Sequence, residues 1–349
     1  MPILVIFTGG TIGCPPPDRD GTLSVRDTQP AGKHYLIENY GNPHKIEFET
    51  MQPLNSLSEN MTVSSWNILL NCLKGIDPSE YDGVIITHGT DSMAFAASMF
   101  GMLLSGIEIP VVFIGSNYHL LDKRADGHRN FADAVNFIRN SKLCGTFVIF
   151  ESKVFLSTRI KQSRHFINKY DMPGDMPFGI MNRERFEFSD FSSYPMAVDF
   201  KNTALRQPLY KRLASISPCV FLIKPYVGLN YDCFSFTKEI KVVLNETYHT
   251  SAGCSETDER EYSIIEFYKR HAGRLKMYIA PFYSSLLAGD ESPRYSSIAT
   301  MLSAGIKTVS NMTVESAYAK LLLAYSLYDE DETISAFLEE PLFFEKVNI

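Results

Sequence analysis

The sequence predicts an α/β protein with two α/β domains, a larger N-terminal one with a doubly wound, mostly parallel sheet and a smaller C-terminal one with a parallel sheet. Three observations predict this class: short runs that are apolar throughout, helical patterns between these runs, and a break in the alternation between about residues 182 and 218. Strands that are apolar at every position are typical of parallel sheets that helices cover on both faces.

The N-terminal part contains four apolar runs of strand length. We expect these strands at 3–7 (ILVIF), 83–87 (GVIIT), 111–115 (VVFIG) and 147–151 (FVIFE). Between them, residues 64–75 and 92–106 carry apolar side chains at helical spacing, and each segment ends at a glycine, as a helix commonly does.

The same rhythm returns after the break. Strands are expected at 219–225, 241–249 and 275–281, and helices at 263–273 and 313–327. The acidic, amphipathic tail that begins at Asp329 predicts a docked terminal helix. We therefore expect an N-terminal domain at 1–190, a linker at 191–217 and a C-terminal domain at 218–349.

Composition restricts the classes of function. The 349 residues are 45% apolar, which is enough for two cores, and the formal charge is -7 without a basic cluster, so we expect no nucleic-acid partner. The first apolar run lacks a basic flank and is too short for a signal peptide or a membrane helix. Six scattered cysteines without a CxxC pair favour free thiols over a zinc site or disulfides. We expect a cytoplasmic protein that does not bind membranes.

Two threonine-containing turns follow predicted strands. TGGTIG occupies 8–13 after the first strand, and THGTDSM occupies 87–93 after the second. Ligands of open parallel sheets bind beyond the carboxyl ends of the strands, and glycine allows the backbone to turn tightly there. Both turns therefore belong to the edge where a ligand is expected.

A phosphate-binding loop is the competing interpretation of the first turn. The chain has neither GxGxxG nor GxxxxGK[ST], and the turn runs into Pro15, Pro16 and Pro17, which lack backbone N–H donors. The sequence therefore disfavours a nucleotide site.

The threonine pair is compatible with nucleophilic catalysis. A threonine hydroxyl can attack a carbonyl group when a neighbouring group activates it, and Asp91 lies next to Thr90. A single Gly-Thr turn is more simply explained by a side chain that ties down its own loop. Two such turns at one sheet edge favour the catalytic explanation.

The two turns also resemble the signature segments of the L-asparaginase and glutaminase-asparaginase family, in the same order and spacing. The match around HGTDSMAFAAS is most similar to the cytoplasmic (type I) branch. Further segments resemble the family at 58–62 (SENMT), 115–116 (GS), 125–127 (ADG), 177–179 (PFG) and 311–321 (NMTVESAYAKL). The resemblance extends along nearly the whole chain and is weaker in the C-terminal half.

The resemblance implies catalytic roles for four residues. Thr11 would attack the substrate amide and form an acyl-enzyme, and Thr90 with Asp91 would be the second threonine and the acidic partner. The family's lysine corresponds to Lys161 when counted from PFG, but to Gln162 when counted from the preceding strand. We choose Lys161; an exposed surface lysine is the alternative.

Substrate-binding roles follow in the same way. Ser58 would bind the substrate α-carboxylate, with Glu59 beside it, and Asp91 would also hold the α-ammonium group. Gly89 in the second motif and the backbone near Ser116 would complete the substrate site, the latter at the oxyanion.

One position departs from the family pattern. Members carry a tyrosine in the loop after TGGTI, and here Thr22 stands at that position. Tyr35 and Tyr40 lie further along the chain and would reach the site only with a differently folded loop.

The resemblance implies hydrolysis of L-asparagine to L-aspartate and ammonia by a homodimer or homotetramer, with no metal and no organic cofactor. Two alternatives stay open: a non-catalytic homologue that senses an amino acid, and a hydrolase of a different carboxamide. Asparagine and glutamine are not separable from sequence, since one methylene changes binding by only about 1–3 kcal/mol.

Overall fold

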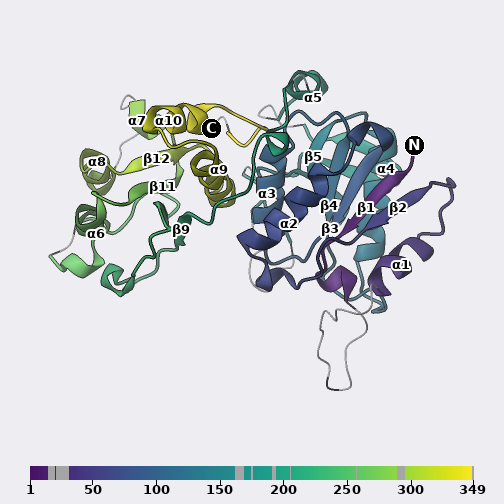
Figure 1. The fold of residues 1–349 in the computed structure, drawn as a ribbon, viewed down its shortest axis with the longest axis horizontal. Coiled ribbons are helices and arrows are strands. Elements are labelled where there is room, and N and C mark those ends of the chain that lie inside the picture. Colours follow the sequence, from purple (N-terminus) through teal and green to yellow (C-terminus); the bar gives the residue numbers. More distant parts are fainter. Residues whose placement is uncertain are drawn as a thin grey trace. The chain divides into compact units, whose positions relative to one another are not determined.

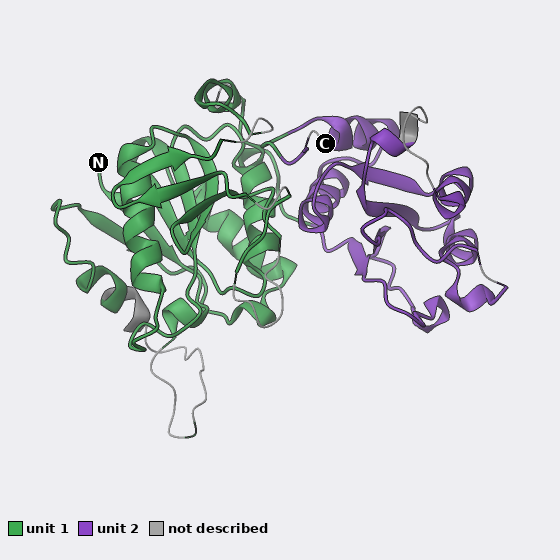
Figure 2. Cartoon of the chain, turned by 180° about the vertical axis from the view of Figure 1, so that it is seen from behind, with its two compact units in different colours: residues 1–216, 342–344 green, residues 217–341, 345–349 purple. Residues whose placement is uncertain are grey.

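The computed structural model forms two compact units (Figure 2). Unit 1 is Met1–Ile216 with Leu342–Phe344, and unit 2 is Ser217–Pro341 with Glu345–Ile349. The predicted class of two α/β domains is confirmed. The domain limits at 190 and 218 stay a prediction; residues 191–216 are counted in unit 1. The structure describes residues 1–14, 20, 31–161, 169–173, 176–190, 194–204, 206–256, 258–288 and 295–347.

Unit 1 is built on an eight-stranded sheet with the order β2-β1-β3-β4-β5-β6-β7-β8. The strands are β1 (Ile3–Phe7), β2 (Phe48–Met51), β3 (Gly83–Thr87), β4 (Pro110–Ile114), β5 (Gly145–Phe150), β6 (Lys153–Leu156), β7 (Gly179–Asn182) and β8 (Arg185–Phe188). Strands β1 to β5 pair in parallel, and β6 to β8 extend the sheet in antiparallel fashion. Of the parallel strands, β1, β3, β4 and β5 were predicted and β2 was not. The fully apolar β1 and β3 are buried at every position because helices cover both faces.

Helices lie on both faces of this sheet (Figure 1). They are α1 (Ala31–Glu38), α2 (Val63–Lys74), α3 (Met93–Leu103), α4 (Gly127–Asn140) and α5 (Ala197–Ala204), with 3-10 turns η1 (Thr11–Gly13), η2 (Ser58–Asn60), η3 (Pro78–Glu80) and η4 (Leu209–Lys211). Helix α2 buries one apolar side, which includes Trp66 and Leu70, and begins at a capping box between Thr62 and Ser65. Helix α3 is apolar around its circumference and is buried almost throughout.

The strand order defines where a ligand can bind. From β1 the chain crosses to β2 on one side, and β3 then pairs on the other side of β1. Such a reversal opens a crevice at the carboxyl ends of the two central strands. The register pairs Phe7 with Thr87 and Thr87 with Ile114, so the turns after β1, β3 and β4 begin at the same edge.

Unit 2 contains a four-stranded parallel sheet with the order β12-β11-β10-β9. Its strands are β9 (Val220–Ile223), β10 (Val242–Glu246), β11 (Lys276–Phe282) and β12 (Lys307–Ser310). Its helices are α6 (Ile264–His271), α7 (Ser285–Ala288), α8 (Ser296–Ser303), α9 (Val314–Leu327) and α10 (Asp331–Glu339), with 3-10 turns η5 (Tyr231–Cys233) and η6 (Arg260–Tyr262). Helix α10 is the expected terminal helix.

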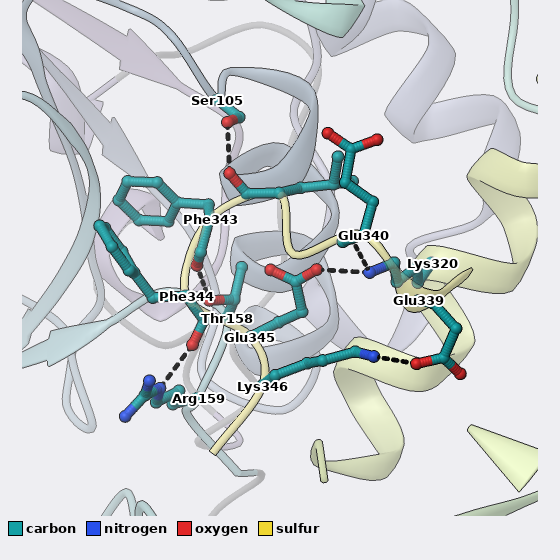
Figure 3. A network of polar contacts seen from close by, with 11 residues as sticks. Ser105, Thr158, Arg159, Lys320, Glu339, Glu340, Phe343, Phe344, Glu345 and Lys346 are labelled. Carbon is teal, nitrogen blue, oxygen red and sulfur yellow. Dashed lines mark hydrogen bonds and ion pairs between the residues drawn. The ribbon is translucent and has the colours of Figure 1, made fainter. Parts of the chain in front are cut away.

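The segment after α10 is held by polar contacts in each unit (Figure 3). In unit 1, the hydroxyls of Ser105 and Thr158 donate to the carbonyls of Leu342 and Phe343, each at 2.5 Å. In unit 2, Lys320 and Glu345 form a fully buried ion pair at 2.6 Å. The residues immediately beyond Pro341 are thus fixed mainly through backbone carbonyls and one buried charge pair.

No helix in the described parts of the chain is long and apolar enough to span a membrane. All six cysteines are free thiols, two of them (Cys14 and Cys219) buried.

Candidate functional site

The turn after β1 is built by two glycines in the left-handed region. Gly9 and Gly10 have φ values of 103° and 76°, which favour glycine because a Cβ atom is strained there. The Ser56 N–H donates to the Thr8 carbonyl at 3.0 Å, and the Gly10 N–H donates to the Ser56 carbonyl at 2.8 Å. The Thr8 hydroxyl donates to the Thr87 carbonyl at 2.7 Å, which ties the ends of β1 and β3 together.

The two threonine-containing turns touch through their backbones. A Cβ atom added at Gly10 would lie 2.4 Å from the Cα and N atoms of Gly89. Only glycine at both positions permits this approach. Since Thr11 and Thr90 follow these glycines directly, the structure brings the two predicted threonines to one edge of the sheet.

Ser58 and Asp91 form the second part of the site. The Ser58 hydroxyl donates to Asp91 Oδ2 at 2.9 Å, and it accepts the Asp91 N–H at 3.2 Å. Ser58 is buried, and a Cβ atom on Gly89 would lie 2.5 Å from its Cβ and Oγ atoms. Glu59, the next residue in η2, is exposed. The structure therefore unites Ser58, Gly89 and Asp91.

His88 makes a hydrogen bond to the backbone of the second turn. Its Nδ1 lies 2.8 Å from the Gly89 carbonyl, which can only accept, so Nδ1 carries the proton. Burial lowers the pKa of this imidazole, which keeps it neutral. His88 is thus a buried neutral donor to the turn.

Ser116 lies in the turn after β4, and its side chain is used within that loop. Its hydroxyl is within donating distance of the Tyr118 carbonyl at 2.5 Å and Asp126 Oδ1 at 2.9 Å, and it accepts the Gly127 N–H at 3.1 Å. The preceding Gly115 approaches the second turn, since a Cβ atom there would lie 3.2 Å from Cγ2 of Thr90. It is the backbone of this turn that adjoins Thr90, while the Ser116 hydroxyl bonds within its own loop.

Lys161 lies in the segment that follows β6. It is exposed, and its N–H donates to the Asp171 carbonyl at 2.9 Å in an isolated bridge. Within the described residues its ammonium group has no hydrogen bond or ion pair. The residue that reaches Thr90 from this bridge is Tyr170, whose hydroxyl donates to the Thr90 carbonyl at 2.7 Å. Sequence analysis did not identify Tyr170, because no motif surrounds it.

The loop position at Thr22 lies outside the described residues. Tyr40 packs edge-on against Phe48 and Phe131, with ring centroids 5.9 Å and 5.5 Å away. Tyr35 lies against His128 at 5.7 Å.

The site offers hydroxyl nucleophiles beside a carboxylate. The hydroxyls of Thr11 and Thr90 make no hydrogen bond to the residues that the structure describes. Cys14 is a competing nucleophile, but burial and the charge of Glu59 raise the pKa of its thiol to about 11, so it stays protonated near neutral pH. Among the described residues, no group of three or more His, Cys, Asp or Glu side chains could hold a metal ion.

The chain is similar in sequence to known proteins of one family. A family model described as asparaginase, N-terminal, matches residues 2–190. The L-asparaginase of Thermococcus kodakarensis is 29% identical over 163 residues, which cover 46% of this chain and 48% of that protein. L-asparaginase 1 of Escherichia coli (strain K12) is 29% identical over 164 residues, which cover 45% and 46%. These matched segments span about half the length of each relative.

The fold similarity extends further. The solved structure of the thermostable L-asparaginase from Thermococcus kodakarensis is 21% identical with a TM-score of 0.77, and the match covers 100% of both chains. At this identity the match establishes the shared two-domain fold alone.

Proposed function

This chain belongs to the asparaginase family, and from that premise we propose that it hydrolyses the side-chain amide of L-asparagine to L-aspartate and ammonia. The observation that carries the proposal is the backbone contact between Gly10 and Gly89, which joins the turns of Thr11 and Thr90. A nucleophile and its partner groups must be held in a fixed geometry for acyl transfer, and a contact between two backbones is a rigid way to do so.

In the first half-reaction, Thr11 Oγ1 attacks the carbonyl carbon of the amide. The Thr11 proton passes by way of the Thr90 hydroxyl and the amine of the proposed Lys161 to the amide nitrogen, with the Asp91 carboxylate beside Thr90. The tetrahedral intermediate collapses, the carbon–nitrogen bond breaks, and the amide nitrogen leaves as ammonia after taking up a proton. The product is an ester between Thr11 and the β-carboxyl of aspartate.

In the second half-reaction, water attacks this ester. The carbon–oxygen bond to Thr11 breaks, the hydroxyl takes up a proton, and L-aspartate leaves. Each tetrahedral intermediate carries an oxyanion, which backbone N–H groups stabilise when they point at it. We assign this task to the backbone of the turns at Gly89 and Ser116.

The substrate's amino-acid end is anchored by complementary charge and hydrogen bonds. The Asp91 carboxylate attracts the α-ammonium group, and the Ser58 hydroxyl donates to the α-carboxylate, with Glu59 at the rim. The 2.9 Å bond between Ser58 and Asp91 supports this assignment, because it places the two groups side by side. On binding, the single Ser58 hydroxyl proton turns from Asp91 to the α-carboxylate, while Asp91 pairs with the ammonium group.

Two further properties belong to the proposal. A cytoplasmic location is supported by the six free cysteines, which are typical of reducing compartments. A homodimer or homotetramer is expected from the family resemblance, and light scattering on the purified protein tests it.

The decisive experiment is ammonia release from L-asparagine and L-glutamine by the purified protein and its Thr11→Ala variant. We expect release from asparagine that falls by at least about a thousandfold in the variant, as when a nucleophile is removed. Thr62→Ala, which changes only a helix cap, is the matched control. A wild-type protein that releases no ammonia but is stabilised by L-aspartate on heating would refute the hydrolase and support the amino-acid sensor.

A further inference from the structure

Tyr170 is a buried tyrosine whose hydroxyl points at the proposed site. Its side chain is 5% exposed, and its ring packs edge-on against Phe150 with centroids 5.0 Å apart. The ring of Phe155 also lies edge-on to it, with the centroids 6.5 Å apart. The ring is thus fixed by core packing, and its hydroxyl donates to the Thr90 carbonyl at 2.7 Å.

The Thr90 carbonyl belongs to the same peptide group as the Asp91 N–H. That N–H donates to the Ser58 hydroxyl at 3.2 Å, so the peptide group is held at both ends, by Tyr170 at its oxygen and by Ser58 at its nitrogen. A peptide group is planar, and two bonds at opposite ends therefore fix its rotation. This rotation sets the directions of the Thr90 and Asp91 side chains.

We propose that Tyr170 is a positioning residue for the amide hydrolysis, which fixes the Thr90–Asp91 peptide group in the orientation that the reaction requires. The inference rests on the proposed function. Tyr170 acts through Thr90, and its hydroxyl is not a group that reacts with the substrate.

The Tyr170 hydroxyl is suited to remain a hydrogen-bond donor at every working pH. Burial and the nearby carboxylates of Asp91 and Asp126 raise the pKa of Tyr170 well above its ordinary value. The hydroxyl therefore keeps its proton over the whole working range of pH and cannot serve as the base that accepts the Thr11 proton.

The test is Tyr170→Phe, which removes the hydroxyl and keeps the packed ring. We expect kcat for L-asparagine to fall about three- to tenfold, the equivalent of one hydrogen bond, with KM within twofold because Ser58 and Asp91 remain. The control is Tyr81→Phe. Tyr81 is also buried and donates to Glu49 at 2.8 Å, but it precedes β3 and lies at the opposite end of the strand.

A second measurement separates positioning from general stability. Hydrogen exchange followed by mass spectrometry should show faster exchange of the peptide that covers 88–93 in Tyr170→Phe, and no change there in Tyr81→Phe. If the wild type is active and Tyr170→Phe changes neither kcat nor the exchange, the positioning role of Tyr170 is refuted and the proposed hydrolysis still stands. An inactive wild type would refute the proposed hydrolysis, while the exchange result would still decide whether Tyr170 holds this peptide group.

Discussion

The Ser58 hydroxyl donates a hydrogen bond of 2.9 Å to the Asp91 carboxylate and accepts one of 3.2 Å from the Asp91 N–H. The two residues are 33 positions apart and meet because Gly89 leaves room for the serine. This pair joins a loop near the start of α2 to the turn after β3. It is the contact on which the proposed recognition of an amino acid depends.

Removal of the Ser58 hydroxyl should weaken substrate binding more than chemistry. In Ser58→Ala we expect KM for L-asparagine to rise about 10- to 100-fold, since a hydrogen bond to a charged group contributes about 1.5–3 kcal/mol, with a smaller fall in kcat. Steady-state kinetics measure this. Ser79→Ala is the control, because Ser79 lies in an exposed turn before β3 and its side chain bonds, among the residues that the structure describes, to Asp77 alone. A fall in kcat alone would contradict the binding role.

A methyl group at Gly89 should damage the site through its neighbour. The added Cβ atom would lie 2.5 Å from Ser58, so Gly89→Ala must displace one of the two. A displacement near 1 Å can lower activity by about 100-fold, and we expect a loss of this size in kcat/KM. Gly273→Ala, where nothing lies within 4 Å of the new atom, is the matched control. Full activity in Gly89→Ala would show that the backbone contact is not required.

Lys161→Met tests the proposed catalytic lysine. If the ammonium group assists proton transfer at Thr90, kcat should fall by about 100-fold or more, as is usual when an acid–base group is lost. Lys153→Met, at the start of β6, is the control. Lys161 is exposed, so an unchanged kcat would be explained by a lysine that is solvated at the surface. A kcat within twofold of wild type would identify Lys161 as a surface residue and remove it from the mechanism.

Protonation of His88 should make stability depend on pH. Burial lowers the pKa of His88 in the folded protein, whereas the unfolded chain has a pKa of about 6.5. Below that pH the unfolded state binds a proton at His88 that the folded state does not bind. The free energy of unfolding therefore falls as the pH drops. In His88→Asn, which keeps a donor for Gly89, we expect the fall in the free energy of unfolding between pH 6.5 and 5.5 to be smaller than in the wild type.

Chemical denaturation at several pH values measures this difference. The control is His249→Asn at an exposed position. An identical pH dependence in His88→Asn and wild type would mean that His88 does not titrate in this way.

The sequence predicted most of the parallel strands, because a buried parallel strand is mostly apolar. The runs at 3–7 and 83–87 coincide with β1 and β3, and the helix expected at 313–327 differs from α9 by one residue. Strands β2, β6, β7, β8 and β12 were not predicted. They are four residues each, and β7 and β8 alternate or expose their residues, which gives little signal against a loop.

By itself, the sequence determined that this protein is an α/β protein of the asparaginase family, with threonine turns after two strands. Those features are local, because a few neighbouring residues are enough to determine a strand of apolar residues or a Gly-Thr turn. Only the tertiary structure decided that Gly10 lies against Gly89 and that Ser58 binds Asp91. It also placed the Tyr170 hydroxyl on the Thr90 carbonyl. These contacts join residues 33 to 80 positions apart, and their geometry is set by strand order and packing, which no short segment encodes.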